Sequence, residues 1–284
     1  MPKNAYMQLQ TLDTGLFKLD GGAMFGVVPK PLWQKLNPAD SQNRCTWAMR
    51  CLLYEQGDRL LLVDTGIGDK QDAKFFSHYD LDRSASLLGS IHAAGYQPSD
   101  VTDVLLTHLH FDHVGGAVAR TNEQLTPTFL KARYWTHPDH WTWATHPNPR
   151  EKASFLRENI WPLQESGQLM FLVQNPFPFA DIDLLYVDGH TEKMALPIFH
   201  YKGRTLAYLA DLVPSSAHVP LPYVMSYDVR PLLTMDEKSQ LLQQAADENW
   251  ILIFEHDPVT EAATVEMTEK GIRLKEKGKL AELL

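Results

Sequence analysis

Cysteine is almost absent from this chain, and its scarcity excludes a fold that depends on disulfide bonds. Among 284 residues only Cys45 and Cys51 are cysteines. The pattern predicts both in one strand, where a separation of six residues places them beyond the reach of a disulfide bond. The N-terminal residues contain no apolar segment typical of an export signal. We therefore predict reduced thiols and a cytoplasmic location.

A long apolar run and an excess of positive charge are also missing. No stretch approaches the roughly 18 apolar residues of a transmembrane helix, so no membrane contact is expected. The chain has 26 Lys and Arg against 35 Asp and Glu, a formal net charge of −9. Proteins that bind nucleic acid usually concentrate basic residues, so this balance argues against a nucleic-acid substrate. The hydrophobic content of 44% is ordinary for a globular protein with a sizeable core.

Short apolar strands alternate with helical segments along the chain. Residues 46–54 and 59–63 flank the turn Glu55-Gln56-Gly57-Asp58 and predict a β-hairpin. Apolar residues at helical spacing predict a helix over 81–94, followed by a glycine at position 95 that suits a helix end. Further strands are predicted at 103–107, 181–187, 197–201, 204–210 and 250–254, and a further helix at 236–248. This mixture predicts a layered α/β sandwich.

One aromatic-rich stretch, at about 135–162, breaks this alternation and predicts an insertion folded over the main body. We expect the whole chain, residues 1–284, to form a single domain around it. The stretch contains His137, His140 and His146, whose spacing favours one face of a surface helix over a further metal site. An apolar insertion on an acidic protein also raises the alternative of a homodimer.

The densest chemical signal is the segment 107–116, THLHFDHVGG, which follows a predicted buried strand. In an extended backbone His108 and His110 point the same way, because side chains alternate along a strand. Asp112 and His113 lie past the bend and can face a second ion. Imidazole and carboxylate groups together suit Zn, Fe or Mn. Surface histidines without a ligand role rarely reach this density, so the segment predicts a metal site.

One loop cannot complete two metal sites, so other parts of the chain must contribute. His190, Asp211 and His256 each follow the end of a predicted strand. Any one of them alone is a weak signal, because a lone histidine at a strand end is more often structural. Their occurrence together and in this order predicts that they complete the site.

With these motifs, from the turn at Asp64 to His256, the chain resembles the metallo-β-lactamase superfamily. The resemblance implies a four-layer αββα sandwich with two divalent metal ions at one edge, zinc by default and iron or manganese as alternatives. It also implies that Asp64 orients a ligand imidazole. The ligands that it implies are His108, His110 and His190 for one metal, Asp112, His113 and His256 for the other, and Asp211 as a bridge between them.

Such a centre would cleave an ester-type bond with a metal-bridging hydroxide. Two ions about 3.5–4 Å apart lower the pKa of a shared water and polarise the scissile carbonyl or phosphoryl oxygen. Asp112 is a candidate catalytic proton donor, and His218 is a second, with a loop histidine bonded to backbone as the alternative. We expect His108→Ala and Asp211→Ala to reduce turnover strongly and His140→Ala to leave it unchanged.

The substrate pocket is expected to contain Met24, Phe25, Trp141 and Tyr223. Aromatic walls suit a neutral, partly apolar ester, although Trp141 could equally pack the insertion onto the main body. The glycine-rich segment before Met24 resembles the acyl-homoserine lactonase and methyl parathion hydrolase branches, which implies a small lactone or organophosphate ester as substrate. The alternatives are a glyoxalase-II-like thioester hydrolase and a nucleic-acid-processing phosphodiesterase of the same superfamily.

Overall fold

The computed structural model describes residues 8–284, which divide into two compact units. Unit 1 comprises residues 8–15, 49–77 and 82–179, and unit 2 comprises residues 16–48, 78–81 and 180–284. The division falls within two long strands, β1 (Gln8–Asp20) and β2 (Arg44–Gln56). The single domain expected from the sequence stays a prediction.

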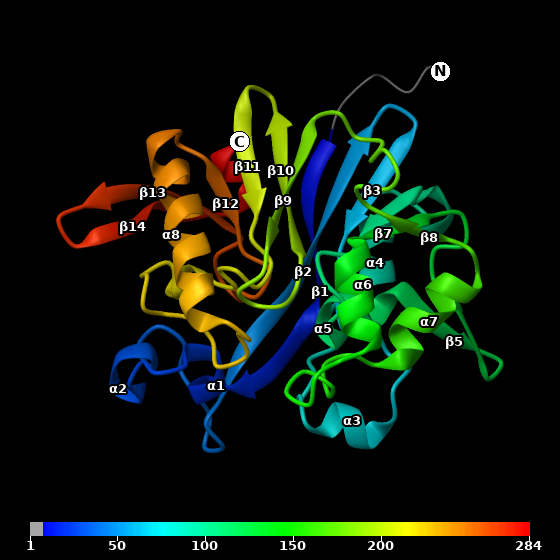
Figure 1. Ribbon diagram of the computed structural model, residues 1–284, viewed down its shortest axis with the longest axis horizontal. Coiled ribbons are helices and arrows are strands. Elements are labelled where there is room, and N and C mark those ends of the chain that lie inside the picture. Colours follow the sequence, from blue (N-terminus) through cyan, green and yellow to red (C-terminus); the bar gives the residue numbers. More distant parts are fainter. Residues whose placement is uncertain (1–7) are drawn as a thin grey trace. The chain divides into compact units, whose positions relative to one another are not determined.

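Unit 1 is built on a six-stranded sheet with the order β1-β2-β3-β4-β7-β8 (Figure 1). The predicted hairpin is confirmed: β2 pairs antiparallel with β3, and Gln56 lies opposite Arg59 at the turn. The next pairings, β3 with β4, β4 with β7 and β7 with β8, are parallel. The bounds of these strands are β3 (Arg59–Val63), β4 (Asp103–Leu105), β7 (Arg133–Thr136) and β8 (Leu169–Phe171).

Helices and a small hairpin complete unit 1. The helix predicted over 81–94 is shorter, because Ser86 is extended and its side chain accepts a hydrogen bond from the Gly89 amide, which caps the helix there. The elements are α3 (Ala73–Ser77), α4 (Leu87–Ala93), α5 (Phe111–Val114), α6 (Pro138–Thr145), α7 (Arg157–Glu165), β5 (Val118–Thr121), β6 (Gln124–Pro127), and the 3₁₀ turns η1 (Pro98–Asp100) and η2 (Gly115–Ala117).

Unit 2 contains a second six-stranded sheet, with the order β14-β13-β12-β11-β10-β9. The strands predicted at 181–187, 197–201, 204–210 and 250–254 are all present in it. The parallel neighbours β11 and β12 are joined through α8, which packs against β13 and β14 (Figure 1). The bounds are β9 (Ile182–Val187), β10 (Met194–Tyr201), β11 (Arg204–Tyr208), β12 (Ile251–Ile253), β13 (Ala262–Thr268), β14 (Gly271–Gly278), α1 (Gly21–Phe25), α2 (Lys30–Trp33), η3 (Ser216–His218), α8 (Pro231–Asp247) and α9 (Leu280–Leu283).

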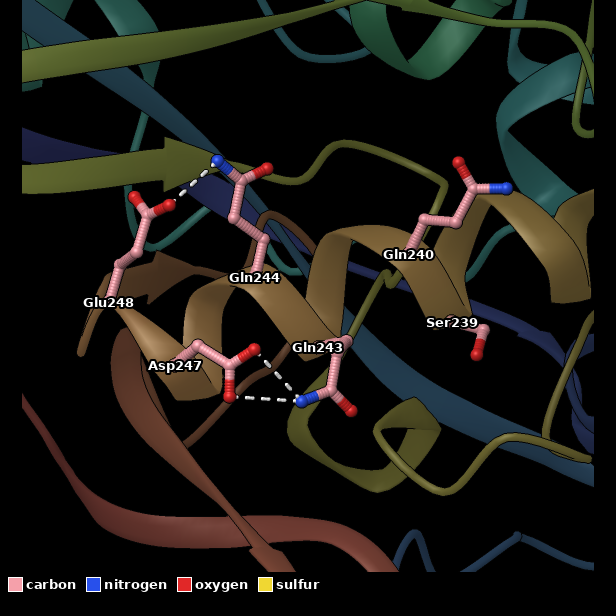
Figure 2. A pocket seen from close by; sticks show the side chains of 6 residues that line it. All are labelled: Ser239, Gln240, Gln243, Gln244, Asp247 and Glu248. Atoms are coloured by element: carbon pink, nitrogen blue, oxygen red, sulfur yellow. Dashed lines mark hydrogen bonds between the residues drawn. The ribbon is translucent and has the colours of Figure 1, made fainter.

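The outer side of α8 carries a shallow polar depression (Figure 2). Gln243 Nε2 donates to both carboxylate oxygens of Asp247, and Gln244 Nε2 donates to Glu248. These pairs are four residues apart, the spacing at which side chains stabilise a helix. None of the residues predicted for the functional site lines this depression.

Two further expectations concern the thiols and the membrane. Cys45 and Cys51 are both free thiols, as predicted, and both are buried. Among residues 8–284, no helix combines the length and the apolar character that crossing a bilayer would demand. The cytoplasmic location stays a prediction.

Candidate metal centre

In unit 1 the two histidines at the end of β4 face each other. His108 Nε2 and His110 Nδ1 are 3.0 Å apart, and both side chains are buried. Two nitrogens bound to one tetrahedral zinc ion, at about 2.0–2.1 Å each, would be separated by roughly 3.4 Å. The two imidazoles are therefore spaced for a common ion. His113 and Asp112 follow on α5, with 3.9 Å between His113 Nε2 and Asp112 Oδ2. We call His108, His110, Asp112 and His113 the first half-set.

Hydrogen bonds fix which nitrogen of these rings is protonated. Thr107 Oγ1 donates to Asp64 Oδ2 at 2.6 Å, so it accepts from His108 Nδ1, 3.1 Å away. His113 Nδ1 donates to the same Asp64 oxygen at 3.1 Å. In both rings Nε2 is then left with a lone pair, as a metal ligand requires.

Asp64 orients two histidines of this half-set, His108 through Thr107 and His113 directly. Its carboxylate also accepts from the Thr107 amide at 2.8 Å, and the residue is fully buried. Its backbone has φ +56°, a conformation that costs a non-glycine residue on the order of 1–3 kcal/mol and is held only where the surroundings require it. This is the geometry that the predicted orienting role of Asp64 needs.

In unit 2 a carboxylate lies between two imidazoles. Asp211 Oδ2 is 3.1 Å from His190 Nε2, and Asp211 Oδ1 is 2.9 Å from His256 Nε2. One oxygen directed toward each ring is the arrangement that a bridging carboxylate needs. We call His190, Asp211 and His256 the second half-set.

The outer nitrogens of this half-set are also bonded within unit 2. His190 Nδ1 donates to Asp228 Oδ1 at 2.9 Å, and His256 Nδ1 donates to the Ala48 carbonyl at 2.7 Å. Burial lowers the pKa of His190, but the carboxylates of Asp211 and Asp228 outweigh it and raise the pKa to about 10. The two carboxylates around this buried imidazole therefore favour a cation at this place, which a bound metal ion would supply.

The donor set as a whole fits a divalent metal. All seven predicted ligands are buried and belong to groups of side chains that could hold an ion. Imidazole nitrogens with carboxylate oxygens suit Zn, Fe or Mn. Histidines whose second nitrogen is held by a carboxylate or a backbone carbonyl are typical of metal sites.

The sequence did not reveal two acidic residues that support ligand histidines. Asp228 is one. The other is Glu151, which lies in the insertion with Oε1 3.5 Å from His110 Nε2. The second oxygen of Glu151 accepts from Trp143 Nε1 at 2.7 Å and from Asn148 Nδ2 at 2.6 Å. Neither acid belongs to a local motif, so only the fold could identify them.

The prediction of a surface helix for the insertion histidines is wrong for two of the three. His140 is fully buried, and its Nε2 accepts the backbone amide of Leu109 at 2.9 Å. His137 is also buried, whereas His146 is exposed. The reason is that α6 packs into the core of unit 1 through Trp141, which contacts Trp161 edge-on with 5.9 Å between ring centroids.

The residues predicted for the substrate pocket divide between the two units. Trp141 contributes to the core of unit 1, which agrees with the packing alternative. In unit 2, Phe25 stacks on His218 at 4.6 Å, and half-buried Tyr223 meets Phe25 edge-on at 6.2 Å. Met24 is buried beside them in α1. The pocket itself stays a prediction.

His218 is tied to the protein through both ring nitrogens. Nε2 donates to the Met24 carbonyl at 2.9 Å, and Nδ1 therefore accepts from Ser215 Oγ at 2.7 Å. Burial lowers the pKa of His218 to about 3, against a smaller raising effect of the Met24 hydrogen bond. A neutral, doubly bonded ring fits the alternative of a loop histidine bonded to backbone. The catalytic roles of His218 and Asp112 stay predictions.

The sequence model of the metallo-beta-lactamase superfamily matches residues 50–256, and the chain belongs to that superfamily. The chain is similar to an N-acyl homoserine lactonase of Bacillus thuringiensis, with 30% identity over 78% of this chain and 85% of the relative. It is also 30% identical to a probable metallo-hydrolase of Mycobacterium bovis over 48% of this chain. The matched part spans about half of that protein's length, 46%.

Solved structures agree with this family. A probable metal-dependent hydrolase from Staphylococcus aureus superposes with a TM-score of 0.87 at 26% identity, covering 96% of each chain. A dizinc quorum-quenching lactonase, AidC, superposes with a TM-score of 0.80 at 20% identity, covering 97% of this chain and 96% of its own; this shows the fold alone. The predicted metallo-β-lactamase fold and the metal-dependent hydrolase class are confirmed.

Proposed function

We propose that this enzyme is a dinuclear hydrolase that opens the ring of a lactone with an acyl side chain. The single observation that carries the proposal is the protonation pattern of the ligand rings. His108, His113, His190 and His256 each donate through Nδ1 to a protein oxygen, which leaves Nε2 as the nitrogen that would bind a metal. When bound, two divalent ions supply Lewis acidity and lower the pKa of a shared water.

Both half-sets are proposed to hold the same pair of ions, in the assignment that the family resemblance implies. The family match supports this, because residues 50–256 include every proposed ligand. Asp211, with one oxygen toward each imidazole of its half-set, is proposed as the bridge. Asp112 is proposed to pass a proton to the leaving oxygen of the opened ring.

The lactone is proposed because relatives carry that activity in their names. They include the N-acyl homoserine lactonases and a dizinc lactonase solved with N-hexanoyl-L-homoserine. Tyr223, which is half-buried and packs edge-on against the buried Phe25 ring in unit 2, would suit an acyl chain.

The test is metal analysis of the purified enzyme followed by a substrate panel. We expect two equivalents of metal, with zinc the default, and the highest kcat/KM on N-acyl homoserine lactones. A higher kcat/KM on a thioester, a phosphotriester or a nucleic acid would replace the lactone by one of the other substrate classes. A metal-free enzyme with full activity would overturn the dinuclear proposal.

A further inference from the structure

A lysine ammonium is buried on the inner side of α8. Lys238 is 0% exposed, and its Nζ donates to the backbone carbonyls of Pro220 at 3.0 Å, Leu221 at 3.2 Å and Tyr223 at 2.9 Å. An ammonium has three protons, so one turn of chain satisfies the entire group.

The charge at this position has an energetic cost for the fold. Removing an ammonium from water is costly unless it is paired or hydrogen-bonded. Burial lowers the pKa of Lys238 to about 7, with the Asp228 carboxylate acting in the opposite direction. An apolar side chain of similar length would fill the same space without this cost. Such a side chain could not donate hydrogen bonds to the three backbone carbonyls.

The segment that Lys238 holds connects one ligand of the second half-set with the residue that supports another. It begins at the ligand Asp211 and ends at Asp228, whose carboxylate accepts from Nδ1 of the ligand His190. Between them, the segment carries His218 and Tyr223, which both contact the Phe25 ring. Lys238 fixes the middle of this segment, where the aromatic side chains are.

The neighbouring residue on α8 holds a different segment. Glu237 accepts from the backbone amides of Asp188 at 2.7 Å and Gly189 at 3.0 Å, directly before the ligand His190. Two adjacent residues of one helix therefore anchor two separate parts of unit 2. Glu237 anchors the chain that carries a metal ligand, and Lys238 anchors the chain that carries the aromatic residues.

We infer that Lys238 is a positioning residue for substrate, which holds residues 220–223 so that half-buried Tyr223, packed against the buried Phe25–His218 stack, contacts the acyl chain of a lactone. This inference rests on the proposed function. It assigns Lys238 to substrate binding and Glu237 to the metal, so the two residues should affect different kinetic and binding quantities.

The experiment compares Lys238→Met with Glu237→Leu in the full-length enzyme. For Lys238→Met we expect the KM for N-hexanoyl homoserine lactone to rise about tenfold, as for the loss of one binding contact of about 1.4 kcal/mol. The KM for γ-butyrolactone, which lacks an acyl chain, and the metal content should stay unchanged. Hydrogen exchange of residues 219–227 should become faster. For Glu237→Leu we expect weaker metal retention against a chelator and no dependence on the acyl chain.

A second variant keeps the inference testable if Lys238→Met does not fold. Tyr223→Ala leaves the backbone carbonyls in place and should raise the KM for the acylated lactone alone. Equal changes of KM on both lactones, or unchanged hydrogen exchange in Lys238→Met, would overturn the inference while the lactonase proposal stands. A wild-type enzyme that cleaves neither lactone would overturn the proposed function and the substrate role of Lys238 with it.

Discussion

The two half-sets of ligands are built in different ways. The first comes from one short segment after β4, and one carboxylate, Asp64, supports two of its histidines, His108 through Thr107 and His113 directly. The second comes from three strand ends far apart in the sequence, and each histidine has its own support, Asp228 for one and the Ala48 carbonyl for the other. Substitution of a supporting residue should therefore disturb two ligand histidines in the first half-set and only one in the second.

The largest effect is expected from a substitution of Asp211, the proposed bridge between the two metal ions. Asp211→Ala removes a buried carboxylate between two imidazoles, and breaking such a pair destabilises the folded protein by about 3–5 kcal/mol. We expect kcat/KM on the lactone to fall on the order of 10³-fold, with loss of metal in elemental analysis. The matched control is Asp183→Ala, since Asp183 also pairs with a histidine of unit 2 but is exposed. Equal activity of Asp211→Ala and the wild type would contradict the bridging role.

Substitutions of the two carboxylates that support ligand histidines, Asp64 and Asp228, distinguish the half-sets more directly. Asp64→Asn and Asp228→Asn each remove the charge that orients a ligand imidazole, and such changes typically cost 10–100-fold in metal affinity. We expect Asp64→Asn to have the larger effect, because its carboxylate accepts from both groups of Thr107 as well as from His113. Chelator competition would measure the affinity of each ion. Equal losses in the two variants would refute the difference in construction.

A smaller effect is expected from the insertion. His140→Ala leaves the buried Leu109 amide without its acceptor, at a cost of about 1–3 kcal/mol. We expect the melting temperature to fall by several degrees and, because Leu109 lies between two ligands, kcat to fall as well. His146→Ala, on the exposed end of the same helix, is the control. An unchanged kcat for His140→Ala would instead agree with the expectation from the sequence that turnover is unaffected.

The smallest effect concerns pH and His218 in unit 2. Its pKa is lowered to about 3 in the folded protein by burial, below the value of about 6.5 in an unfolded chain. The unfolded state therefore binds the proton first, and stability is lost as pH falls from about 6.5 toward 3. We expect His218→Gln to lose less stability over this interval than the wild type in urea unfolding. Parallel pH curves would mean that another group causes the acid sensitivity.

The sequence predicted what is local or follows a strand. The β-hairpin was visible in the apolar runs on either side of the turn 55–58, and the first half-set in the density of histidines after one strand. The second half-set was predicted from three strand-end residues taken together, since a single histidine at a strand end carries little information. Only its assignment to the two metals came from the family resemblance.

The acidic residues that support ligand histidines could not be predicted from the sequence, because they come from distant parts of the chain. Glu151 and Asp228 each reach a histidine about 40 residues away, and nothing in their neighbourhood marks them. The spacing of His137 and His140 predicts a shared helix face but not whether that face is buried. The packing of Trp141 into the core of unit 1 decides this.

The central claim, that the two half-sets serve one pair of ions, is tested most directly by metal stoichiometry. Chelator-treated enzyme, reconstituted with zinc, should bind two equivalents per chain, and the His108→Ala and Asp211→Ala variants should each bind fewer. A wild-type enzyme that takes up no more than one ion, or variants that keep both, would contradict the account.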